Sequence, residues 1–142
     1  MNGGSSRPAA GIPLGTILTV LALIHVYWAR GGSAGKQQTI PTVKGRPTID
    51  PGPAMTYAVA GALATGATFA FARSGALPLV PRKLARLATA TMALVFAARA
   101  VGDFRTVGFF KRERSTTFAR WDTRLFSPLC AVMAVLSAGA AR

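Results

Sequence analysis

The side chains best suited to chemistry gather in one short segment, residues 118–130. It combines a carboxylate, guanidinium groups, aromatic rings, a hydroxyl and the only thiol of the chain: Phe118, Arg120, Trp121, Asp122, Arg124, Phe126, Ser127 and Cys130. Arginine side chains bind anions, and a thiol becomes a nucleophile when a base lies beside it. An apolar run follows directly, so we expect this segment at the mouth of a hydrophobic helix.

Four long apolar segments must position this group. They cover residues 12–29, 54–72, 84–102 and 125–141. Only the third contains charges, Arg86 near its start and Arg99 near its end. A helix of about 18 residues is about 27 Å long, which is enough to cross the apolar core of a bilayer. Such segments are too long for barrel strands, and apolar and polar residues do not alternate along them. The sequence therefore predicts an all-α fold, a four-helix transmembrane bundle.

The chain of 142 residues has the length of one domain. We assign residues 12–142 to a single membrane domain that follows a flexible segment, residues 1–11, rich in Gly, Ser and Pro. A signal peptide cleaved near Gly32 is the rival interpretation of the first apolar segment. Arg30 beside that position and the three further spans argue against cleavage.

The charge is strongly one-sided, with 17 Lys and Arg against 4 Asp and Glu. These bases lie between the apolar segments, as in juxtamembrane regions, and do not follow one amphipathic surface, which argues against nucleic acid as a partner. With one cysteine and one histidine, the chain offers no internal disulfide, no Cys-x-x-Cys site and no multi-histidine metal site. Any metal site would need carboxylates or a partner chain.

Four spans place the first and third connectors on one face of the membrane. Two polar connectors, residues 30–53 and 103–124, therefore share a face with the end of the first span, the end of the third and the start of the fourth. We expect the polar side chains at these positions to form one candidate site: His25, Trp28, Arg99, Asp103, Asp122, Arg124, Ser127 and Cys130.

Each of these residues also has a purely structural interpretation. Arg99 would be costly in apolar surroundings unless it pairs with Asp103 or Asp122, or with a substrate anion. His25 is explained by one hydrogen bond to a neighbouring helix, or by a role as proton shuttle or axial haem ligand. Cys130 is a small buried side chain unless His25 acts as its base. Trp28 is explained as one of the aromatic residues that gather where a span meets the membrane surface. Asp122 and Arg124 are explained as a pair in which the aspartate caps a helix and the arginine extends its charge to the membrane surface.

Two motifs resemble those of a known family. The first is His25-Val-Tyr-Trp-Ala-Arg-Gly-Gly32, at the end of the first span, and the second runs from Phe118 through Asp122-Thr-Arg-Leu-Phe-Ser-Pro-Leu-Cys130. They resemble the motifs of a family of small bacterial membrane proteins catalogued as domain of unknown function 3995. The resemblance implies four spans and a role for both motifs, but no activity. Phe126 stands where the family would have a tyrosine, which removes a hydroxyl from any polar site.

The sequence favours a multi-pass protein of the cell membrane that acts as a binding or accessory protein. Its polar site would hold an anionic lipid, a small anion or a partner subunit. One alternative is a membrane enzyme or redox carrier using His25 with Asp103 or Asp122, and another is a purely structural bundle. No cofactor is implied, although haem on His25 stays open. The connector face has more bases than the other face, which weakly favours the connectors on the inside.

Overall fold

The computed structural model describes residues 9–142, which form an almost wholly helical chain. The long helices are α1 (Gly11–Ala29), α2 (Pro53–Ser74), α3 (Arg82–Val101) and a fourth that comprises α4 (Thr117–Trp121), η2 (Asp122–Phe126) and α5 (Ser127–Ala140). Within this part of the chain, four helices are long and apolar enough to cross a membrane. The predicted four-helix bundle is confirmed. Of the N-terminal segment predicted to be flexible, residues 1–8 lie outside the described residues.

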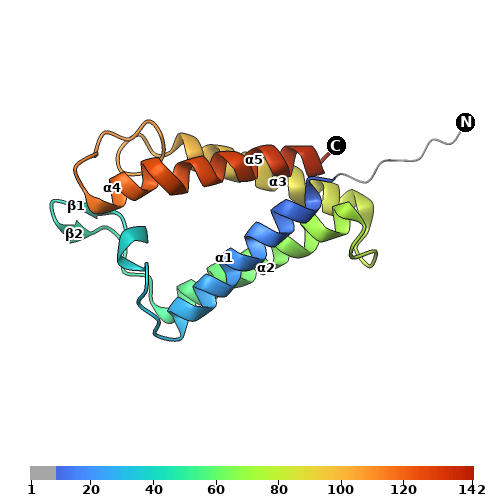
Figure 1. The fold of residues 1–142 in the computed structure, drawn as a ribbon, viewed down its shortest axis with the longest axis horizontal. Helices are drawn as coiled ribbons and strands as arrows, with labels where there is room; N and C mark the ends of the chain where they lie inside the picture. The colour runs from blue at the N-terminus through green and yellow to red at the C-terminus, as the bar shows by residue number, and fades with distance from the viewer. Residues whose placement is uncertain (1–8) are drawn as a thin grey trace, which may run out of the picture.

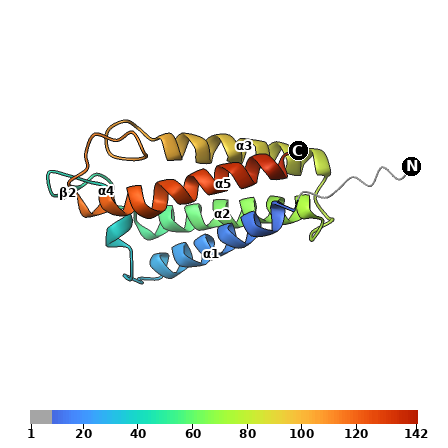
Figure 2. The same cartoon turned by 45° about the horizontal axis from the view of Figure 1, so that its top comes forward.

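The helices form two pairs, α1 with α2 and α3 with α5. In Figure 1 these pairs make a V, closed at the end where α1 begins and α5 ends. A further view shows all four helices running alongside one another (Figure 2). The closed end is filled by a core of Leu14, Leu18, Ala67, Ala70, Met133 and Ala140.

Small residues allow the helices of the closed end to approach closely. A Cβ added to Gly15 of α1 would lie 2.7 Å from the ring of Phe71 in α2. Arg73 of α2 donates from Nε to the carbonyl of Ala140, at 2.6 Å, and also bonds the carbonyl of Arg142. These bonds satisfy carbonyl groups that the end of α5 leaves without a helical partner. The closed end is therefore held by packing and by a side-chain cap.

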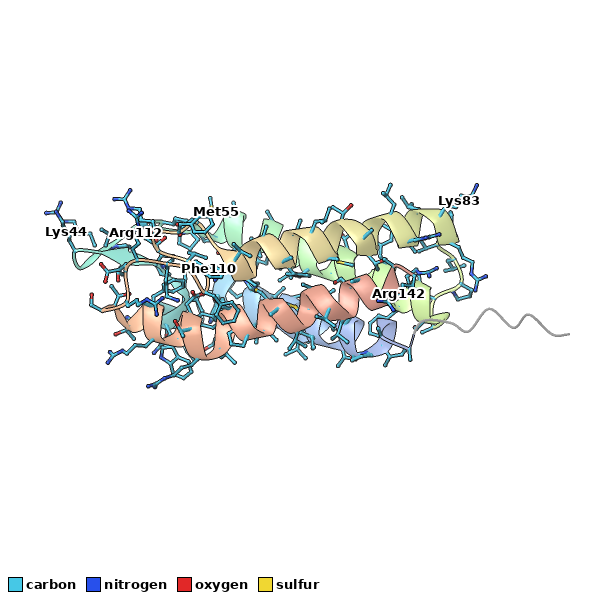
Figure 3. The ribbon with its side chains drawn as sticks, turned by 90° about the horizontal axis from the view of Figure 1, so that it is seen from above. Lys44, Met55, Lys83, Phe110, Arg112 and Arg142 are labelled. Atoms are coloured by element: carbon cyan, nitrogen blue, oxygen red, sulfur yellow. The ribbon has the colours of Figure 1, made fainter. Side chains whose placement is uncertain are left out.

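The open end of the V carries both polar connectors, as predicted from the topology (Figure 1). The first connector contains a 3₁₀ turn, η1 (Gln37–Thr39), and a hairpin of β1 (Thr42–Val43) and β2 (Arg46–Pro47). Its two-residue loop, Lys44–Gly45, has positive φ at both positions, as the tightest hairpin turns require. In Figure 3 Lys44 and Arg112 lie at this end, while Lys83 and Arg142 lie at the opposite end.

The predicted bounds need correction at the fourth helix, which begins at Thr117 and not at residue 125. Thr116 caps it, because its Oγ1 accepts a hydrogen bond from the backbone N–H of Ala119 at 3.0 Å. The helix then passes through a wide π turn, in which the N–H of Ser127 donates to the carbonyl of Asp122. Pro128 follows within the helix, where it has no N–H to donate. Ser127 therefore lies within one continuous helix.

The bounds of the second and third spans shift by two residues or fewer. The second helix extends to Ser74 and ends at Gly75, whose φ of 82° gives the left-handed conformation common after helices. The third begins at Arg82 and ends at Val101. Gly102, with φ of 95°, turns the chain into the second connector.

Candidate functional site

Asp122, the first residue of the π turn, is the centre of the polar cluster. Its side chain is completely buried and accepts four hydrogen bonds. Arg99 donates to Oδ1 at 2.8 Å, while the Gly108 backbone N–H, Lys111 Nζ and Ser127 Oγ reach Oδ2 at 2.8, 2.9 and 3.1 Å. A buried carboxylate needs such partners to offset its lost hydration. Asp122 thereby joins α3, the second connector and the fourth helix.

Lys111 is a member of this cluster that the sequence did not reveal. Although it belongs to a polar connector, only 1% of its side chain is accessible. Its ammonium donates to Asp122, to the Gly108 carbonyl at 2.9 Å and to Thr123 Oγ1 at 2.7 Å. An ammonium has three donors, so Lys111 is saturated. The apolar run before it, Val107 to Phe110, was the available signal that this connector folds back onto the bundle.

Arg99 pairs with Asp122 and not with Asp103, which resolves one of the alternatives stated for it. The pair uses only Nη2 of the guanidinium. The other terminal nitrogen, Nη1, is buried and has no hydrogen-bond partner among the described residues. A buried guanidinium N–H without a partner is costly, so this group has the capacity to bind one more acceptor.

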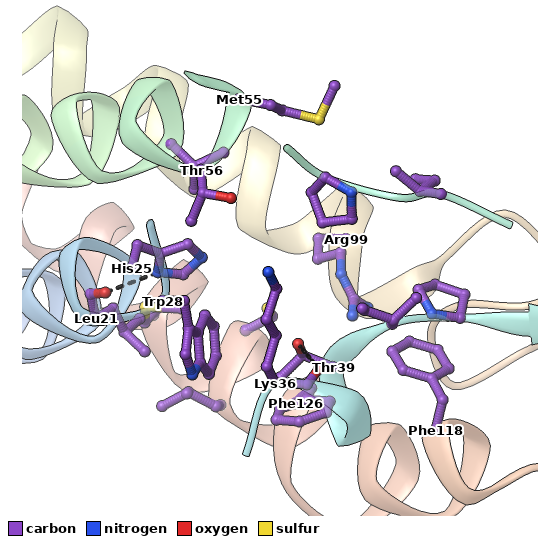
Figure 4. Close-up of a pocket in the computed structure, with 18 residues that line it drawn as sticks. Leu21, His25, Trp28, Lys36, Thr39, Met55, Thr56, Arg99, Phe118 and Phe126 are labelled. Carbon is purple, nitrogen blue, oxygen red and sulfur yellow. Dashed lines mark hydrogen bonds between the residues drawn. The ribbon is translucent and has the colours of Figure 1, made fainter. Parts of the chain in front are cut away.

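His25 and Trp28 lie together at the end of α1. Their rings contact edge to face, with centroids 5.1 Å apart. His25 Nδ1 lies 2.7 Å from the carbonyl of Leu21, one turn back in the same helix. Because a carbonyl can only accept, Nδ1 is the donor, and Nε2 is left to face the cavity (Figure 4). Trp28 Nε1 donates to the Ala34 carbonyl at 2.7 Å and so ties the first connector to α1.

A cavity of about 400 Å³ lies between these residues at the open end of the V. All four long helices and the first connector contribute to its wall. Most of the lining is apolar, including Leu21, Val59, Leu129 and Met133 at the bundle side. Phe118 and Phe126, whose ring centroids are 6.2 Å apart, line the cavity from earlier in the same helix as Leu129 and Met133.

Basic side chains reach the cavity from three separate elements. His25 comes from α1, Lys36 from the first connector and Arg99 from α3 (Figure 4). In that view the Lys36 ammonium points between the His25 ring and the Arg99 guanidinium. No Asp or Glu of residues 9–142 lines the cavity. The cavity therefore presents positive charge without an acidic counterpart in its wall.

Two of the predicted site residues lie apart from this cavity. Asp103 closes its own loop, accepting from the backbone N–H groups of Arg105, Thr106 and Val107 at 2.7–2.9 Å and from Thr106 Oγ1. Burial would raise the pKa of Asp103, but these hydrogen bonds outweigh it and hold that pKa well below its usual value. Arg124 is exposed on the outer side of the fourth helix, near Trp121. Neither residue joins His25 or Arg99.

Ser127 and Cys130 occupy the inner side of the same helix. Ser127 is buried against Asp122, while Cys130 is half-buried and lines the cavity with His25. No hydrogen bond joins His25 to a carboxylate or to the thiol among the residues described. Likewise, the described chain contains no cluster of three or more His, Cys, Asp or Glu side chains placed to hold a metal ion.

Comparison with known proteins agrees with this structure without adding an activity. No curated protein and no solved structure matched the chain. The family model described as "Protein of unknown function (DUF3995)" matches residues 18–137, a range that contains His25, Arg99, Asp122 and Cys130. The chain therefore belongs to the DUF3995 family.

Proposed function

We propose that this protein is a membrane-embedded binding protein whose cavity holds an anionic group. The observation that carries the proposal is that Arg99 lines the cavity and that its buried Nη1 has no hydrogen-bond partner in the described chain. An oxyanion placed there would complete the hydrogen bonding of the guanidinium.

The charges of the buried cluster support an anionic ligand. Arg99 and Lys111 bring two positive charges, and Asp122 brings one negative charge, which leaves an excess of one positive charge. Lys111 is saturated by Asp122, Gly108 and Thr123, so the excess is directed through Arg99 toward the cavity. Positive charge in apolar surroundings is unfavourable until an anion compensates it.

The site is also well prepared for binding. Asp122 fixes Arg99 through Nη2, so little side-chain freedom is lost when Nη1 meets a ligand. Lys36 contributes a second positive charge from the first connector, and Trp28 holds that connector against α1 through Ala34. An anion would therefore bridge the bundle and the connector.

Tryptophan fluorescence provides a direct test of anion binding. The chain has two tryptophans; Trp28 lines the cavity, and Trp121 is exposed and does not line it. In a Trp121→Phe background, titration of the detergent-purified protein with inorganic phosphate should change the Trp28 emission to saturation.

Arg99→Gln in this background should weaken phosphate binding at least tenfold, since a hydrogen bond to a charged group contributes about 1.5–3 kcal/mol. Arg124→Gln is the matched control, because this exposed arginine lies outside the cavity wall, and it should leave the affinity unchanged. Equal loss in both variants, or a signal that never saturates, would contradict the proposal.

A further inference from the structure

We infer that the ligand is an amphiphile with an anionic head and a single hydrocarbon chain, the class that includes fatty acids and alkyl phosphates. This inference rests on the proposed anion site and specifies what the rest of the cavity accepts. It follows from the arrangement of polar and apolar lining, the size of the cavity and its place between the helix pairs.

Apart from the basic groups, the wall is largely apolar and extends along the fourth helix. Along the fourth helix the lining runs from Phe118 to Met133, which corresponds to about 22 Å at 1.5 Å per residue. Toward the bundle centre, the wall contains Leu21, Val59 and Met133. A small inorganic anion would leave this apolar surface uncovered, whereas a hydrocarbon chain would bury it.

The size of the cavity selects one chain over two. A volume of about 400 Å³ is near the lower end of the range for small-ligand sites. Met133 belongs to the packed core of the closed end and is almost fully buried, so it forms a floor that prevents deeper entry. A phospholipid with two full chains would have to leave at least one chain outside.

The bilayer supplies such molecules directly to this place. The cavity takes its walls from both helix pairs, at the end where Figure 1 shows them diverging. Val59, part of the apolar wall, is 40% exposed. The apolar portion thus lies within the membrane-spanning length of the helices, while Lys36 belongs to the connector beyond them.

Cys130, the only cysteine of the chain, gives a readout inside the cavity. We would reconstitute the full chain in zwitterionic nanodiscs and measure how fast a small maleimide labels Cys130. Butyl, octyl and dodecyl phosphate would be compared at equal mole fraction in the bilayer, with inorganic phosphate, dodecanol and a two-chain phosphatidic acid as further probes. Dodecyl phosphate should protect the thiol at least tenfold better than butyl phosphate, and dodecanol and phosphatidic acid should protect weakly.

Two phenylalanine substitutions separate binding in the cavity from simple partitioning into the bilayer. Val59→Phe fills the apolar part and should remove the advantage of the long chain while butyl phosphate still protects. Val135→Phe, at a position 72% exposed and outside the wall, is the matched control and should behave as the unchanged protein does.

The outcomes distinguish the two proposals. Equal protection by butyl, dodecyl and inorganic phosphate would overturn the single-chain inference and leave the anion site intact. Equal protection by phosphatidic acid or by dodecanol would also overturn it. The anion site itself is refuted if no phosphate compound protects Cys130. It is also refuted if the phosphate compounds protect Cys130 as well in the Arg99→Gln variant as in the unchanged protein.

Discussion

Replacing Asp122 by asparagine tests the central claim about the cluster, that one carboxylate holds two cations in place. The substitution keeps the shape of the side chain and removes its charge. Lys111, with 1% of its side chain accessible, would then be a buried charge without an ion-pair partner. Removing one partner of a buried pair costs about 3–5 kcal/mol. Lys111 keeps its hydrogen bonds to the Gly108 carbonyl and to Thr123, and the Arg99 side chain is 32% accessible. We therefore expect a loss of stability at the lower end of this range, about 3 kcal/mol.

The decisive comparison is with the double variant Asp122→Asn, Lys111→Met. Removing both members of a buried pair is often close to neutral, because no orphaned charge remains. The double variant should therefore be more stable than Asp122→Asn alone, by about 1–2 kcal/mol. An effect of this sign cannot arise if the two residues act independently, since two damaging substitutions would then add.

The free energy of unfolding can be measured by titrating the protein in mixed micelles with a denaturing detergent and following its helical circular dichroism. Asp50→Asn, in the exposed part of the first connector, is the matched control and should stay within about 0.5 kcal/mol of the unchanged protein. The reasoning is refuted if Asp122→Asn also stays within that range, or if the double variant is less stable than the single one.

Four further predictions use the same unfolding measurement. Thr116→Ala should destabilise the fourth helix by about 1 kcal/mol through loss of its cap. Thr123→Ala should leave one N–H of the Lys111 ammonium without an acceptor and lower stability by a similar amount. Gly102→Ala should be more damaging, because a Cβ would lie 1.8 Å from the Val107 carbonyl oxygen at a φ of 95°. Gly61→Ala, in open space on α2, is its control and should not destabilise the protein, since alanine favours a helix over glycine. The depressed pKa of Asp103 means that its carboxylate stabilises the fold above about pH 4, the value for an unfolded chain, and that this contribution is lost as the pH falls toward its folded pKa. The stability difference between the unchanged protein and Asp103→Ala should accordingly shrink on acidification below about pH 4, and a difference that grows there would contradict the assignment.

The sequence was sufficient for the fold because the strongest constraint on it is the bilayer. Apolar runs long enough to cross a membrane must be helical, and because each crossing changes sides, alternate connectors lie on one face. This logic brought His25, Arg99 and Cys130 to the same end of the bundle. It could not predict that the Asp103 side chain bonds the backbone of its own loop. The hydrogen bonds that it accepts from the backbone N–H groups of Arg105 to Val107 depend on local loop geometry.

The predicted start of the fourth helix was wrong because charged residues were taken to mark its boundary. Arg120, Asp122 and Arg124 look too polar for a span, yet Asp122 is compensated by Arg99 and Lys111 and is buried. Such compensation joins residues 11 to 23 positions apart and leaves no periodic signal in the sequence. The same holds for Lys36, whose place in the cavity wall depends on the path of the whole first connector.

The wide turn at residues 122–126 lets the fourth helix hold one residue more than a regular helix would over the same turn. Because the extra residue is taken up within this one widened turn, the segments before and after it keep their faces, and Phe118 and Met133 both line the cavity. The same residue added to a regular helix would rotate everything before it by about 100° relative to Cys130 and Met133. Asp122 would then turn away from Arg99, although every residue with chemical capacity would still be present. A relative one residue shorter here, with an ordinary helical turn in this place, should therefore keep both the bundle and the cavity wall.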